Sequence, residues 1–291
     1  MIASEHLLHP DVWLPKALAH EKRVDAWADP HRALHRRGES HPVYDFLFTY
    51  YSFTPGQLRR WHPGCGVTIT GPGSERFLEW TGYAKTPDGV TASPQALKPA
   101  RREFFRWLLG MLEATEGRPA LFACYGLHEW AMLYRADEVR HSRWPLRLPP
   151  AQIAAIVESQ SLCCTHFDAF RFFAPEARPL NRIQPERART PELEQRGCLH
   201  ANMDLYKWAY KLTPLCPSSL IADCFELARE IREVDMRASP YDFTALGFAP
   251  IRIEEAAGRA LYERLQRDFS LRSVPLRGRL IGLLREVVHS L

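Results

Sequence analysis

Residues 198–211 carry several chemically active side chains at a spacing typical of one helix face. Residues three or four positions apart are neighbours on a helix. The polar residues that would share this face are His200, Asp204, Lys207 and Lys211. There the Asp204 carboxylate could stabilise positive charge or activate water, with the His200 imidazole carrying the proton. The same spacing also fits an exposed helix crossed by ion pairs, so both interpretations stay open.

A second candidate lies in the aromatic segment 165–173, whose alternation suggests a strand although a helix is also compatible with it. In a strand, His166 and Asp168 share a face, whereas in a helix Asp168 lies beside Arg171. A charge among aromatic rings must be paired, because burying an isolated charge is very costly. The pattern therefore indicates either an active-site acid beside an aromatic wall or a structural Asp–Arg pair.

His128 and Glu129 match the beginning of a zinc-protease motif, in which a second histidine follows four residues after the first. Position 132 holds Met132, and this excludes the metalloprotease motif. Glu129 remains a candidate catalytic carboxylate, and the alternative is an ordinary pair on a helix surface. A further polar group surrounds the predicted end of another helix: Asp235, Arg237, Tyr241 and Asp242.

Sequence motifs for several other chemistries are missing. The sequence contains no phosphate-binding P-loop, dinucleotide fingerprint, nucleophile elbow or helix-hairpin-helix signature. His128, His166 and His200, together with nearby carboxylates, have the donor chemistry of a metal site. The sequence alone does not show that these three side chains meet.

The elements that must position these residues are predicted to be mainly helical. Apolar residues recur at helical spacing in 101–116, 199–212, 218–236, 254–269 and 276–288. We also expect a helix at 121–134, and helical pieces within 12–37 that are interrupted at Pro15 and Pro30. Residues 63–100, rich in Gly and Pro, predict an irregular, loop-rich insertion with a small β component, including a short strand at 67–70. The expected fold is a single mainly α domain spanning 1–291.

Composition and charge narrow the class of protein. The chain has 291 residues and a net charge of +4, which permits a polyanionic partner without requiring one. Its seven cysteines include no CxxC pair, which favours free thiols in a reducing compartment. The N-terminal residues lack a signal-peptide pattern, and no apolar run approaches the roughly 20 residues of a membrane-spanning helix. We therefore expect a soluble, cytoplasmic protein with no membrane partner.

Five stretches of the chain together resemble one family. They read YDFLFTYYSFTPGQLRRWHP (44–63), GLHEWAM (126–132), CTHFDAFRFF (164–173), CLHANMDLYKWAYKL (198–212) and DMRASPYD (235–242). The chain resembles an actinobacterial-type family commonly labelled 3-methyladenine DNA glycosylase, and the likeness covers most of its length. The resemblance implies excision of alkylated purines from DNA in base-excision repair. Such an enzyme needs a flipped-base pocket with aromatic walls, a carboxylate beside the sugar and basic residues for the phosphates.

The leading hypothesis is therefore a DNA N-glycosylase, a hydrolase that works without a metal or another cofactor. Its candidate catalytic residues are Asp204 as the carboxylate, His200 and His166 as proton carriers, and Asp168 and Glu129 as further acids. Its candidate base-binding residues are Tyr50, Tyr51 and Trp208. The logarithm of its binding constant for DNA should fall linearly with the logarithm of the salt concentration.

Two alternatives stay open. In the first, His128, His166, His200 and carboxylates bind a metal, or act alone, in a hydrolase or other enzyme that acts on a small nucleoside or metabolite. A structure with these three histidines far apart would exclude its metal-binding form. The second alternative is a non-enzymatic helical module that binds a protein partner through residues 63–100.

Overall fold

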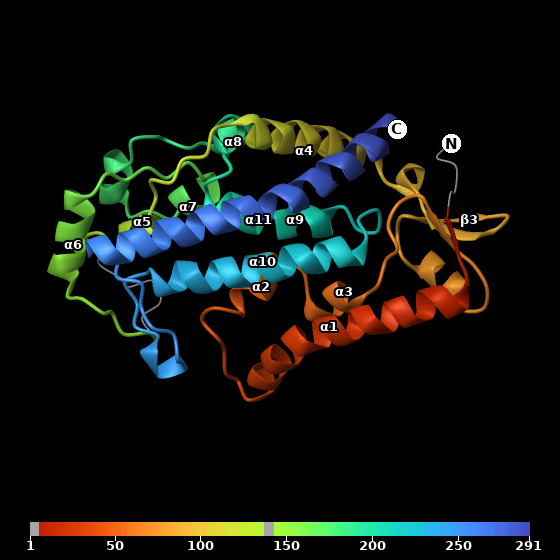
Figure 1. Cartoon of the computed structure of the whole chain (residues 1–291), viewed down its shortest axis with the longest axis horizontal. Helices are drawn as coiled ribbons and strands as arrows, with labels where there is room; N and C mark the ends of the chain where they lie inside the picture. Colours follow the sequence, from red (N-terminus) through yellow and green to blue (C-terminus); the bar gives the residue numbers. More distant parts are fainter. Residues whose placement is uncertain (1–5, 137–142) are drawn as a thin grey trace. The chain divides into compact units, whose positions relative to one another are not determined.

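The computed structural model describes residues 6–136 and 143–291, and its helical content confirms the mainly α fold class. Figure 1 shows the arrangement of the elements along the chain. The α-helices are α1 (Pro10–Arg36), α2 (Phe46–Thr49), α3 (Pro55–Arg59), α4 (Pro99–Gly117), α5 (Leu127–Ala131), α6 (Pro150–Ser159), α7 (Phe167–Phe170), α8 (Thr190–Leu193), α9 (Leu199–Lys211), α10 (Ser218–Arg237) and α11 (Ala256–His289). The 3-10 helices are η1 (Ser74–Glu79), η2 (Pro94–Ala96), η3 (Pro175–Leu180), η4 (Arg187–Arg189) and η5 (Thr244–Leu246). The strands are β1 (His6–Leu8), β2 (Val67–Ile69), β3 (Tyr83–Thr86) and β4 (Gly89–Ala92).

The chain divides into two compact units, and each is assembled from segments that are distant in sequence. Unit 1 comprises Met1–Gly110, Leu205–Arg229 and Pro275–Leu291, and unit 2 comprises Met111–Asp204 and Glu230–Val274. Helices α4, α9, α10 and α11 contribute residues to both units. In the part of the chain that is described, no helix is both long and apolar enough to cross a membrane.

A small sheet in unit 1 confirms the β component expected within 63–100. The strand order is β1-β2-β4-β3, with β1 parallel to β2 and with β4 antiparallel to both β2 and β3. The strand predicted at 67–70 is β2. Gly89 opens β4 with a φ of +151°, and a Cβ at this position would lie 2.2 Å from the carbonyl oxygen of Ile69. The close approach of β4 to β2 therefore requires glycine.

Helix α1 packs along α3 in unit 1 (Figure 1). The expected interruptions of this helix at Pro15 and Pro30 are wrong, because both prolines lie inside α1. A proline in a helix interior costs about 3 kcal/mol. A continuous buried face offsets that cost, and its residues recur every three or four positions: Trp13, Ala17, His20, Val24 and Ala28.

Other helix boundaries also differ from the sequence prediction. The two helices expected at 254–269 and 276–288 are one helix, α11, which continues through Pro275. The helix expected at 121–134 shortens to α5, because Tyr125 and Gly126 have positive φ angles of 48° and 73° and cannot extend it. The segment 165–173 contains the short helix α7 in place of a strand.

Candidate metal centre

Three side chains from three helices of unit 2 form a first donor group. His128 lies in α5, His200 in the first turn of α9, and Asp235 near the end of α10. Their ligand-type atoms all lie within 4.8 Å of one another. Nε2 of His128 is 3.0 Å from Oδ1 of Asp235, yet neither atom has a hydrogen-bond partner among the described residues. Two imidazoles and one carboxylate are a donor set typical of transition-metal sites.

A second donor group lies beside the first in unit 2. His166 immediately precedes α7, Glu194 immediately follows α8, and Asp204 lies in α9. Nε2 of His166 is 3.4 Å from Oε1 of Glu194 and 3.4 Å from Oδ2 of Asp204. All three side chains are buried. One imidazole and two carboxylates again form a set that could hold a divalent cation.

His200 joins the two donor groups, because its ring contacts both of the other imidazoles. Its centroid lies 4.5 Å from that of His128 in an edge-to-face arrangement and 5.2 Å from that of His166 in a stacked one. The three histidines thus converge, as the metal-binding alternative requires. We call the two groups together the six-residue cluster: His128, His166, Glu194, His200, Asp204 and Asp235.

Strong electrostatic effects accompany the burial of these groups. Burial is the largest single effect on His128 and opposes its protonation, but Asp235 and Cys124 together hold the pKa of His128 well above its usual value. Burial is the largest single effect on Asp235 and raises its pKa, but the combined effects of His128, His200 and Arg232 lower the pKa overall. Burial, reinforced by the neighbouring His128, lowers the pKa of His200. Arg232 adds a buried positive charge, with its Nη1 3.1 Å from Oδ2 of Asp235 and 3.3 Å from Oε1 of Glu129.

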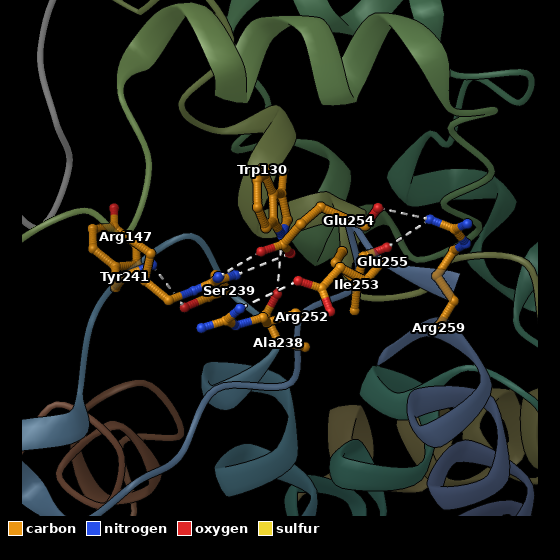
Figure 2. Close-up of polar contacts among 10 residues, drawn as sticks. All are labelled: Trp130, Arg147, Ala238, Ser239, Tyr241, Arg252, Ile253, Glu254, Glu255 and Arg259. Atoms are coloured by element: carbon orange, nitrogen blue, oxygen red, sulfur yellow. Dashed lines mark hydrogen bonds and ion pairs between the residues drawn. The ribbon is translucent and has the colours of Figure 1, made fainter. Parts of the chain in front are cut away.

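A polar network fixes α5, which carries His128, to the chain that follows α10, which carries Asp235 (Figure 2). The indole Nε1 of Trp130 donates a hydrogen bond to the carbonyl oxygen of Ala238 at 2.9 Å. The guanidinium of Arg147 lies 5.5 Å from the Trp130 ring centroid and donates to the carbonyl oxygen of Ser239. Arg147 also forms an ion pair of 2.7 Å with Glu254, and the side chains of this pair are only 8% and 15% exposed. These contacts set the position of His128 relative to Asp235.

The loops that carry His166 and Glu194 are held through their backbones. The buried side chain of Asn181 accepts a hydrogen bond from the Cys164 amide at 2.7 Å and donates to the Cys164 carbonyl at 2.9 Å. This fixes the chain two residues before His166. Arg118 donates to the carbonyl oxygen of Glu194 and, at 3.0 Å, to that of Pro191. Neither loop has helical periodicity, so its position depends on these side-chain contacts.

A small cavity borders the cluster at His128 and His200. Its volume of about 10 Å³ matches the room that one water molecule needs. The cavity is also lined by four cysteine thiols: Cys124, Cys163, Cys164 and Cys198. Burial raises the pKa of Cys164 and of Cys198, which favours the neutral thiol at both positions. The cavity therefore offers space for a water molecule beside imidazole nitrogen and neutral sulfur.

Three of the five candidate catalytic residues, His166, His200 and Asp204, come together in the cluster. Glu129 is connected to the cluster by Arg232, which forms ion pairs with both Glu129 and Asp235. Asp168 is placed differently: its Oδ1 forms an ion pair of 3.1 Å with Nε of Arg171, in keeping with the structural alternative for this segment.

The three candidate base-binding aromatics belong to unit 1. Tyr50 stacks on Phe46 with centroids 4.6 Å apart, and the buried Tyr51 meets Tyr206 edge to face. Trp208 lies among other aromatic rings, with the centroid of Trp107 at 5.9 Å. Their role as the walls of a base pocket stays a prediction.

The sequence predicts no link between the three histidines and either Glu194 or Asp235. Glu194 follows a short helix in a loop, and no periodic pattern links it to His166. Asp235 was noted at a helix end, but nothing in its spacing connects it with His128. Comparisons with family models, with curated proteins and with solved structures give no match for this chain.

Proposed function

We propose that the protein is a metal-dependent hydrolase whose six-residue cluster holds two divalent ions. The observation that carries the proposal is the convergence of two donor groups on the ring of His200, which contacts both other histidines. The first ion would be held by His128, His200 and Asp235, and the second by His166, Glu194 and Asp204. This reading replaces the expectation of an enzyme without a metal.

The charges of the cluster support bound cations. The side chains of Glu194, Asp204 and Asp235 are only 4%, 2% and 1% exposed. Ionised carboxylates at such depth carry a desolvation penalty of several kcal/mol each unless positive charge compensates them. Arg232 contributes one positive charge, which is shared between Asp235 and Glu129, and the raised pKa of His128 places a second beside Asp235. Bound divalent ions would add positive charge beside these buried carboxylates.

The donor separations also support bound cations. Ligands at roughly 2.1 Å from one ion lie about 3.4 Å apart in a tetrahedron and about 3.0 Å apart at neighbouring corners of an octahedron. The distances from His166 to Glu194 and to Asp204 are both 3.4 Å, and the distance from His128 to Asp235 is 3.0 Å. The facing atoms of His128 and Asp235 form an ion pair at that distance, and a bound ion would take the place of the proton between them.

The surroundings of the cluster favour hydrolysis. A divalent ion makes bound water acidic, which supplies a nucleophile at neutral pH. The adjacent cavity has room for one water molecule. Its four thiols would be open to oxidation beside a centre that generates oxidants, whereas a redox-inactive ion such as zinc is compatible with them. Imidazole and carboxylate donors in this number suit zinc or manganese.

The substrate class that we propose is a small nucleoside or a related metabolite. The excision of 3-methyladenine from DNA, which the family resemblance implies, stays a prediction. Both reactions hydrolyse an N-glycosidic bond, so the same activated water could serve either. We also propose a cytoplasmic location, because all seven cysteines are free thiols, as is usual in a reducing compartment.

Metal content is the first test. The protein would be purified after growth with zinc, manganese and iron, dialysed, and analysed by elemental mass spectrometry. We expect about two ions per chain in the wild type and fewer than one in His200→Ala. The matched control is Asp168→Asn, which alters a carboxylate of α7 outside the cluster and should keep both ions. Wild-type protein that stays folded yet binds none of these metals would overturn the proposal.

Activity is tested separately on the metal-loaded protein. Nucleosides and methylated DNA would be offered in parallel, and the released bases resolved by chromatography. Base release from nucleosides that chelation abolishes would support the proposed substrate class. Release of 3-methyladenine from DNA that chelation does not affect would instead support the metal-free glycosylase hypothesis.

A further inference from the structure

Unit 1 contains a pocket of about 600 Å³, a volume within the range of small-molecule sites. It is lined by residues of α3, of α4, of the end of α9 and of the segments next to them. The lining includes three cations, Arg60, Arg101 and Lys211, and the aromatic rings of Phe53, Trp80, Phe104 and Tyr210. The pocket lies entirely within unit 1 and shares no residue with the six-residue cluster, which belongs to unit 2.

Positive charge in this pocket exceeds negative charge. Glu79 is the one carboxylate in the lining, against three cations. His62 also lines the pocket, but burial lowers its pKa to about 3, so its ring is neutral. An excess of fixed positive charge in a cleft favours an anionic ligand.

Two of the three cations lack a carboxylate partner within the described residues. The guanidinium of Arg101 is partly buried and donates instead to the backbone carbonyl oxygens of Lys211 and Thr213, at 2.6 and 3.0 Å. Arg60 lies over the Trp80 ring, 5.5 Å from its centroid. By contrast, the preceding residue Arg59 forms ion pairs with Glu21 and Asp25. Arg60 and Arg101 therefore remain available to bind an anion.

The aromatic residues supply flat surfaces beside these cations. The rings of Phe53 and Tyr210 are parallel, with centroids 4.6 Å apart and an interplanar angle of 11°. The hydroxyl of Tyr210 donates to the backbone carbonyl of Tyr51, which fixes the ring. Ser52, also in the lining, has a φ of +52°, and such strained backbone is concentrated at ligand sites. Aromatic faces next to arginine are the usual surface for stacking a nucleobase.

We propose that this pocket binds a nucleotide unit, with its phosphate at Arg60, Arg101 and Lys211 and its base against Trp80 and the Phe53–Tyr210 pair. The phosphate would supply the negative charge that Arg60 and Arg101 lack, and guanidinium groups suit it because they can donate two parallel hydrogen bonds. The nucleotide unit is either a free mononucleotide or one nucleotide of a single strand. Both sources present the same base and phosphate.

The test measures binding by isothermal titration to the full-length protein, with four probes: adenosine monophosphate, adenosine, inorganic phosphate and a short single-stranded oligonucleotide. We expect the monophosphate to bind at least about tenfold more tightly than adenosine or phosphate alone, because each lacks one half of the recognised group. Tighter binding of the oligonucleotide than of the monophosphate would identify a strand as the source, and the reverse would identify a free nucleotide.

Two exposed positions provide variants that should fold normally. Arg60→Ala and Lys211→Ala should each weaken binding of the monophosphate about tenfold. Arg106→Ala is the matched control, since Arg106 is exposed on α4 and lies outside the pocket lining. The proposal is overturned if the wild type binds neither the monophosphate nor the oligonucleotide at millimolar concentration, or if all three variants bind as the wild type does.

Discussion

At the scale of single residues, Asp235 is the ligand whose contribution to the metal centre is most directly tested, because each of its oxygens faces a different partner. Its Oδ2 faces Arg232 at 3.1 Å, while its Oδ1 lies 3.0 Å from Nε2 of His128 without hydrogen-bond alignment. The contact with His128 is a buried ion pair in the absence of a metal. Its length also suits two ligands of one ion, which would replace the proton on Nε2 of His128.

Asp235→Asn is expected to remove one ion and leave the other. The amide keeps the shape of the carboxylate but loses its charge, so the first donor group should weaken, whereas His166, Glu194 and Asp204 keep the second. Elemental analysis should therefore fall from about two ions per chain to about one. Asp242→Asn is the control, because Asp242 lies outside the cluster. Unchanged metal content in Asp235→Asn would remove Asp235 from the ligand set.

His62 in unit 1 predicts a dependence of stability on pH. Burial, with smaller contributions from His20 and Arg60, lowers the pKa of His62 from 6.5 to about 3. Between pH 6.5 and pH 3, His62 is therefore protonated in the unfolded chain but neutral in the folded protein. The contribution of neutral His62 to the free energy of unfolding is complete above pH 6.5. It is lost as the pH falls toward 3, by a few kcal/mol in total.

His62→Gln should flatten this dependence, because glutamine does not titrate. Urea unfolding between pH 7 and pH 4 would measure it, with His289→Gln as a control at an exposed position. A variant whose stability declines with acid as steeply as that of the wild type would show that His62 is not responsible. In the wild type, Nδ1 of His62 forms a hydrogen bond with the Tyr83 hydroxyl. The amide of glutamine can also donate or accept a hydrogen bond at this position.

At the scale of elements, the short helix α5 depends on its surroundings for its position. Gly126 immediately precedes it with a φ of +73°, and a Cβ there would approach Ala238 and Tyr262 to 3.3 Å. A helix of five residues has little stability of its own. The contacts of Trp130 and Arg147 in Figure 2 therefore hold His128 at the cluster.

Arg147→Met is expected to destabilise the protein by about 3 kcal/mol, because it leaves the nearly buried carboxylate of Glu254 without its partner. Arg252→Met is the matched control in the same region, since the Arg252–Glu255 pair is 61% and 55% exposed and is worth at most about 1 kcal/mol. Urea unfolding measures both variants. Metal content should also fall in Arg147→Met, which a purely structural pair remote from the cluster would not cause.

The elements that the sequence predicts well are those with a long apolar stripe. The helices α4, α9 and α10 follow the expected ranges closely, because their buried faces repeat every three or four residues. The short helices α5 and α7 have no such repeat, and tertiary contacts determine them. Helices α1 and α11 are longer than the sequence predicts, and both continue through prolines. The free-energy cost of a proline in a helix is local, whereas the tertiary packing that offsets it leaves no local pattern.

The same division applies to the candidate centre. His200 and Asp204 could be predicted because they lie one turn apart on one helix, which leaves a local pattern. His128, Glu194 and Asp235 come from other segments and join them by tertiary packing alone. The convergence of six ligands from α5, α9, α10 and two loops is therefore a property of the fold, with no signal in the spacing of residues along the chain.

At the scale of the whole molecule, the six ligands belong to one compact unit although they span residues 128–235 in sequence. Unit 1 supplies none of them, and it contains the sheet and the aromatic, basic pocket. Metal binding should therefore stabilise unit 2 specifically. A ligand present at a thousand times its dissociation constant stabilises the folded state by about 4 kcal/mol.

Chelation is expected to raise amide hydrogen exchange in α5, in α7 and in residues 194–204, while β2 and β4 in unit 1 keep their protection. The reason is that removal of the ions leaves three buried carboxylates less well compensated, and local opening of unit 2 then costs less free energy. Mass spectrometry of peptides from the chelated and the metal-loaded protein would show the difference. His200→Ala provides the control, since a protein that already lacks the ions should respond little to the chelator. Equal changes in both units would mean that chelation acts on global stability, and no change in either would mean that these carboxylates are stabilised without a metal.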